Sequence, residues 1–161
     1  MKIFLILILL PLSGYINCQT TTLVELGKVG GLHFSLAKSD TINMVGISQN
    51  DPFSLRMIGV PESEVAEVVQ ILNSFAVETG RKPAEQKTIT NRTKSLLLTC
   101  SYFKSKGWSV MIQHTDPAYD ETAKEINEKT SFNVNHFVEI KPNEIPGVVK
   151  MFSKAFPAKG V

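Results

Sequence analysis

Two stretches of the 161-residue chain share one pattern at a distance of 80 positions. VPESEVAEVVQILNSF begins at Val60, and IKPNEIPGVVKMFSKAF begins at Ile140. Each joins the end of a strand-like run to apolar residues at helical spacing, and Val68 in the first matches Val148 in the second. Any strand followed by an amphipathic helix resembles any other, but here the order hairpin, loop, strand and helix recurs as a whole. The pattern therefore favours an internal duplication.

The duplication predicts an α+β fold of two ββ(loop)βα units, mainly antiparallel sheet with two amphipathic helices packed on it. We expect residues 19–161 to form a single compact α+β domain of two similar halves, at about 22–80 and 94–157. A half of about 60 residues buries too little apolar surface to be stable alone. The second half is therefore expected to complete the core of the first.

Alternation and helical spacing predict the individual elements. Strands are expected in 23–38 as a pair joined near Gly27 to Gly31, in 53–60, in 95–114 as a hairpin with its turn at Lys104 to Gly107, and in 135–140. The first helix is predicted to start near Pro61 and Ser63 and to stop at Gly80. Its buried face is expected to contain Val65, Val68, Val69, Leu72 and Phe75. Its exposed face is expected to contain Glu64, Glu67, Gln70 and Asn73. The last helix is predicted to bury Ile145, Val148, Val149, Phe152 and Phe156, with Asn143 as its cap.

Three further segments are polar. Residues 39–52 are expected to form a loop, alone or with one short strand, and 78–94 a connector between the halves. Residues 116–130 have no strong apolar stripe, which indicates an exposed helix or a long loop.

The first 18 residues have the order of a secretory signal peptide. Lys2 is followed by the apolar run Ile3 to Leu12, about half the length that spans a bilayer, and then by Ser13 and Gly14. We expect a secreted or periplasmic protein without a transmembrane helix in the mature chain. The alternative is a membrane-anchored lipoprotein with a lipid anchor at Cys18. Cys100 then remains as a free thiol, expected to be buried in a strand, and a disulfide framework is excluded.

Catalytic motifs are scarce. The chain has no Gly-rich phosphate loop, no GxSxG, no HExxH and no paired CxxC, and no cofactor or metal is expected. The weak catalytic candidates are His114, Asp116, Tyr119 and Asp120, at the end of a strand where a loop begins. The same residues are also explained by a turn at Asp116 followed by the first turn of an exposed helix. His33 and His136 lie in expected strands and are interpreted as solvent-facing or satisfied.

A second candidate, for binding, lies at the expected hairpin turn. Tyr102 and Trp108 flank Lys104 and Lys106, a combination that could stack a sugar or a base. The alternative is a cross-strand aromatic pair with lysines at the hairpin tip. Asn91 begins an Asn-Arg-Thr triplet that accepts a glycan only in a eukaryote.

These observations favour an exported, non-enzymatic binding or accessory protein that presents a sheet face or a loop to a protein, a glycan or a small ligand. One alternative is a small secreted hydrolase or metal-dependent enzyme that uses the His114/Asp116 loop. The other is a single-strand nucleic-acid-binding module. A formal net charge of +2, which becomes +1 without residues 1–18, makes nucleic acid the least favoured partner.

Overall fold

The computed structural model describes residues 22–39, 41, 43–51, 54–129 and 133–157. These residues form a mixed α+β fold, as predicted, with three α-helices and two sheets. In chain order the elements are β1 (Thr22–Val29), β2 (Leu32–Lys38), β3 (Asn43–Asp51), β4 (Ser54–Pro61), α1 (Glu62–Thr79), β5 (Lys87–Arg92), β6 (Leu96–Phe103), β7 (Gly107–His114), α2 (Pro117–Lys129), β8 (Asn133–Asn135), β9 (Phe137–Ile140) and α3 (Ile145–Ala155).

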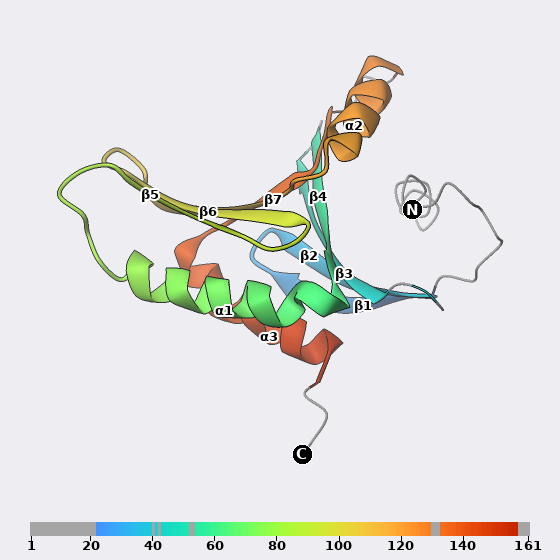
Figure 1. Cartoon of the computed structure of the whole chain (residues 1–161), viewed down its shortest axis with the longest axis horizontal. Coiled ribbons are helices and arrows are strands. Elements are labelled where there is room, and N and C mark those ends of the chain that lie inside the picture. The colour runs from blue at the N-terminus through green and yellow to red at the C-terminus, as the bar shows by residue number, and fades with distance from the viewer. Residues whose placement is uncertain (1–21, 40, 42, 52–53, 130–132, 158–161) are drawn as a thin grey trace.

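The strands divide between two sheets, where the sequence led us to expect one pseudo-symmetric sheet. The larger sheet has the order β1-β2-β3-β4-β8, and the smaller has the order β5-β6-β7-β9. Neighbouring strands are antiparallel except β4 and the short β8, which are parallel. The helices α1 and α3 run side by side and contact each other, while α2 lies apart from them (Figure 1).

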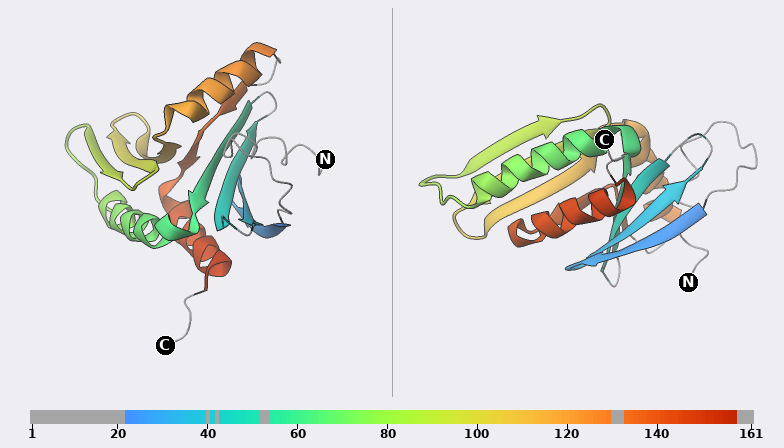
Figure 2. Two further views of the ribbon diagram at one scale, coloured as in Figure 1. Left: turned by 45° about the vertical axis from the view of Figure 1, so that its right-hand side comes forward. Right: turned by 90° about the horizontal axis from the view of Figure 1, so that it is seen from below.

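One hydrophobic core joins both sheets to α1 and α3. Strand alternation places one face of each sheet toward it, and the largest fully buried side chains include Phe34 from β2, Phe75 from α1 and Phe152 from α3. The two views of Figure 2 show α1 and α3 together against the strands. The core thus takes side chains from both halves of the chain, while the duplication itself stays a prediction.

Several elements follow the sequence prediction. The hairpins β1–β2 and β6–β7 form, and Gly107 ends the second turn with φ +79°, a conformation that strains other residues. Helix α1 begins directly after Pro61 and is followed by Gly80. The thiol of Cys100 is buried in β6, as expected, and burial raises its pKa to about 11.

Other elements differ from the prediction. The expected loop at 39–52 contains the nine-residue strand β3, whose Val45 and Ile47 are buried in the core while Met44, Gly46 and Ser48 lie on the other face. The expected connector at 78–94 contains β5, an edge strand that pairs with β6 although most of its side chains are exposed. Residues 117–129, by contrast, form the helix α2, the first of the two alternatives expected for 116–130.

Two details of the helices are also corrected. Asn143 lies inside a 3-10 turn (Pro142–Glu144) and Glu144 precedes α3, so Asn143 is not the cap of that helix. Glu64, expected on the exposed face of α1, is only 6% exposed. In the described part of the chain, no helix is long and apolar enough to cross a membrane.

Candidate functional site

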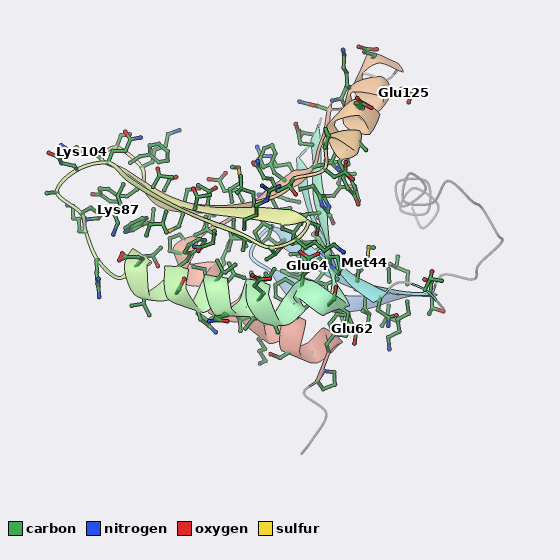
Figure 3. All side chains as sticks on the ribbon, in the orientation of Figure 1. Met44, Glu62, Glu64, Lys87, Lys104 and Glu125 are labelled. Atoms are coloured by element: carbon green, nitrogen blue, oxygen red, sulfur yellow. The ribbon has the colours of Figure 1, made fainter. Side chains whose placement is uncertain are left out.

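A cavity of about 760 Å³ lies on the outer face of the five-stranded sheet, opposite the core. Alternation creates this face: Val45 and Ile47 of β3 are buried in the core, whereas Met44, Gly46 and Ser48 turn their side-chain positions to the cavity. The lining residues are Leu23, Ser35, Ala37, Thr41, Asn43, Met44, Gly46, Ile47, Ser48, Met57, Ile58, Gly59, Pro61, Glu62, Ser63, Glu64, Lys94, Ser95, His114, Asp116, Tyr119 and His136. Figure 3 shows Met44, Glu62 and Glu64 close together at the start of α1.

Small residues form the floor of the cavity. Ser35, Gly46 and Gly59 are register partners across β2, β3 and β4. A Cβ atom at Gly46 would stand 2.9 Å from the Ser35 Oγ, and one at Gly59 would stand 3.0 Å from the Met44 Sδ. Both glycines therefore let neighbouring side chains lie close to the sheet, and larger residues in this row would occupy the cavity.

Glu64 fixes one wall. Its carboxylate accepts hydrogen bonds from the Thr93 hydroxyl, from the Ser95 N–H at 3.1 Å and from the Ser95 hydroxyl at 2.8 Å. Burial by itself raises the pKa of Glu64, but these hydrogen bonds, with the charge of Lys94, outweigh burial and lower the pKa below its usual value of 4.5. The first turn of α1 is thereby fastened to the β5–β6 turn by an ionised side chain.

His114 lies where the two sheets meet. Its Nε2 accepts a hydrogen bond from the Gly59 N–H of β4 at 3.3 Å, and its backbone N–H donates to the His136 carbonyl at 3.3 Å. Burial lowers the pKa of His114 to about 4, helped by the nearby His136; the Ser95 backbone, Asp116 and Glu64 act in the opposite direction. The ring is therefore neutral at neutral pH, which leaves Nε2 free to accept the bond from Gly59.

Three aromatic rings form a cluster beside the cavity. Tyr119 stacks on His114 with centroids 3.9 Å apart and planes 2° apart, and His136 meets both rings edge-on, at 5.2 Å from Tyr119 and 6.5 Å from His114. Burial raises the pKa of Tyr119, and the charge of Asp116 adds to this, so its hydroxyl stays protonated. His114 and Tyr119 therefore present uncharged polar groups at neutral pH.

The structure thus brings three of the four catalytic candidates to one cavity: His114, Asp116 and Tyr119. Asp116 also has a structural role, because its Oδ1 accepts the Ala118 N–H at 2.9 Å and so caps α2. Asp120 lies in α2, but its side chain is outside the described residues. Glu64, Lys94, Ser95 and His136 join the cavity from distant segments and were not predicted as site residues.

The aromatic hairpin is arranged as a cross-strand pair. Tyr102 and Trp108 are register partners with centroids 5.3 Å apart, and the Trp108 Nε1–H donates to the Arg81 carbonyl at 2.7 Å. Because Tyr102 is only 5% exposed, it has little ring surface for a ligand. Lys104 and Lys106 are exposed at the tip, and Figure 3 shows Lys104 at the left-hand end of the molecule and Met44 near the start of α1. This geometry favours pairing over a binding platform.

Two modification sites stay predictions. Asn91 is partly buried in β5, and Thr93 of the same triplet is buried and bonded to Glu64. Cys18 lies outside the described residues.

Comparison of the sequence with protein-family models found no match, and comparison with curated proteins found no significant match. Among the residues that the structure describes, no group of three or more His, Cys, Asp or Glu side chains is arranged to hold a metal ion.

Proposed function

We propose that the protein is an exported, non-enzymatic binding protein that takes up a small, largely apolar ligand in the cavity on the outer face of the five-stranded sheet. The observation that carries this proposal is the cavity itself. Its volume of about 760 Å³ is in the range of small-molecule sites. Its apolar surface comes from Leu23, Ala37, Met44, Met57 and Pro61.

The lining suits a ligand with an apolar body and a polar end. The side chains of Met44 and Met57 are flexible and adapt to different apolar shapes. Polar groups also line the cavity, among them Ser63 of α1, Lys94 of the β5–β6 turn and Tyr119 of α2. In small-molecule sites, apolar contacts hold the ligand and a few polar groups fix its orientation.

Binding is favoured over catalysis by the state of His114. A second candidate function, a hydrolase that uses the His114/Asp116 loop, is supported by the cavity that both residues line. However, the Nε2 of His114 is engaged by the Gly59 N–H, and a ring with a pKa of about 4 is a weak general base at neutral pH. Saturable turnover of a p-nitrophenyl ester that depends on His114 would favour the enzyme.

The first prediction is that the cavity binds an apolar probe. N-phenyl-1-naphthylamine should bind saturably, with a rise in its fluorescence, and Ser35→Phe should weaken binding at least roughly tenfold, about 1.4 kcal/mol, because the new ring fills the floor above Gly46. Fluorescence titration measures the affinity, and circular dichroism checks that the variant is folded.

Thr90→Phe is the matched control. It adds the same ring to an exposed position of β5, outside the cavity, and should leave the affinity unchanged. Saturable binding that a folded Ser35→Phe protein retains in full would show that the probe binds elsewhere and would count against the proposed site.

Export is proposed from the pattern of residues 1–18 and predicts a shortened native product. The intact mass of protein isolated from its source should correspond to a chain that begins at Gln19, or to one that begins at a lipid-modified Cys18 if the protein is anchored. A mass that includes the whole apolar run Ile3 to Leu12 would contradict export by signal cleavage.

A further inference from the structure

We propose that His114 makes the cavity pH-sensitive: its neutral ring fastens the two sheets together beside the cavity, and its protonation releases this contact and weakens ligand binding. The inference rests on the proposed binding function and adds its regulation.

The contact exists because β8 is short. It pairs with β4 only at Ser54, Leu55 and Arg56, so the edge of β4 continues beyond it. The Gly59 N–H on that stretch donates a hydrogen bond to the Nε2 of His114, at the end of β7. One imidazole therefore links the five-stranded sheet to the four-stranded sheet.

Protonation reverses the chemistry of this link. A neutral imidazole accepts at one nitrogen, whereas an imidazolium ion has an N–H on both. The Nε2–H of a protonated His114 would face the Gly59 N–H, and two donors cannot form a hydrogen bond. The ring must then move, and because it lines the cavity and stacks on Tyr119, its movement changes the cavity wall.

A second cavity gives the charged ring a polar place to go. It has a volume of about 590 Å³ and is lined by both His114 and His136, together with polar residues of α2 that include Asn127 and Glu128. The carboxylate of Glu128 would favour an imidazolium ion in this space. The same histidine therefore borders the ligand cavity and a polar alternative.

Charged and titratable groups face His114 from each neighbouring element. His136 opposes protonation, and Asp116 and Glu64 favour it. The remaining groups along the two cavities are Tyr119, Glu62, Lys94, Lys124 and Glu128. Burial outweighs the carboxylates, since the pKa of His114 falls from 6.5 to about 4.

The sign of the effect follows from these two pKa values. A released, solvated ring binds its proton near pH 6.5, whereas the ring in contact with Gly59 does so only near pH 4. Acid therefore favours the released form, and the balance shifts as the pH falls from 6.5 to 4. The shift in the ratio of the two forms is roughly 50-fold between pH 7 and pH 4.5.

Amide hydrogen exchange at Gly59, measured by NMR on the whole protein from pH 7 to 4.5, tests the release. After correction for the intrinsic exchange rate, the opening constant should rise roughly 50-fold. The affinity for N-phenyl-1-naphthylamine should fall over the same range, with near-ultraviolet circular dichroism confirming that the protein stays folded. An opening constant that stays flat, or an affinity that does not fall, would overturn the proposal.

Three variants test whether His114 causes the pH dependence of Gly59 exchange and of probe affinity. His114→Gln keeps an acceptor for the Gly59 N–H but cannot titrate, so both responses should disappear; His33→Gln removes a histidine outside the cavity and should behave as wild type. Responses that persist in His114→Gln, or that disappear only in His136→Gln, would refute the role of His114. If His114→Gln does not fold, the wild-type protein provides the test. The NMR titration of the His114 imidazole must then occur over the same pH range as the rise in the opening constant at Gly59.

The two proposals fail separately. Absence of probe binding at pH 7 would refute the proposed function, whereas Gly59 exchange would still report whether His114 releases the Gly59 N–H. Binding at pH 7 that is equally strong at pH 4.5 would leave the binding function standing and remove its regulation.

Discussion

Replacement of Val68 by aspartate should destabilise the folded protein severely at 25 °C. Val68 is 0% exposed and belongs to the core that joins α1 to both sheets and α3. An unpaired carboxylate there has no hydrogen-bond donor in an apolar environment, and we expect a loss of at least about 4 kcal/mol. This is a large part of the roughly 5–15 kcal/mol that stabilises a typical domain.

Val77→Asp is the matched control. It makes the same substitution in the same helix, but Val77 is 66% exposed, so the free energy of unfolding should change by no more than about 1 kcal/mol. Urea denaturation followed by circular dichroism measures both variants. A cooperative transition of near wild-type stability in Val68→Asp would show that the buried face of α1 is misassigned.

The second large effect is expected from Glu64→Ala. The substitution leaves the Thr93 hydroxyl and the Ser95 N–H and hydroxyl without their shared acceptor. Unsatisfied buried donors are costly, and we expect a loss of about 2–4 kcal/mol in the free energy of unfolding. Because Glu64 also lines the cavity, probe binding should weaken as its wall loosens.

The pH dependence distinguishes this role from simple loss of packing. The folded pKa of Glu64 is lowered, so its stabilising contribution is present above the unfolded value of 4.5 and is lost as the pH falls through the lower folded value. In Glu64→Ala that part of the acid dependence should be missing, whereas Glu67→Ala, an exposed change one turn away, should keep it. Equal acid sensitivity in all three proteins would contradict the assigned role of Glu64.

Those parts of the fold with strong periodicity could be predicted from the sequence. The apolar spacing in 65–75 and 145–152 marks α1 and α3, and alternation marks β2, β6 and β7. The nine-residue length of β3 was not predicted because Val45 and Ile47 are surrounded by Asn, Ser and Gly, which are typical of loops. Strand β5 was missed because it contains few apolar side chains and so shows no apolar alternation. It is held to β6 by backbone hydrogen bonds.

The candidate site was predictable only where its residues are close in sequence. His114, Asp116 and Tyr119 lie within six positions, so one segment already indicated them. His136 joins them through β8 and β9, whose pairing no local pattern specifies. For Glu64 a signal did exist: it lies four positions before Val68, on the side of the helix that is buried.

Strands β3 and β4 carry core side chains on one face and cavity side chains on the other. A ligand in the cavity would therefore contact the same strands whose other face forms the hydrophobic core. Its binding should raise the melting temperature of the protein. A ligand at 100 times its dissociation constant adds about 2.7 kcal/mol to a folded state that alone binds it. Melting curves of the unlabelled protein against a chemical library are thus a direct test of whether the cavity binds a ligand.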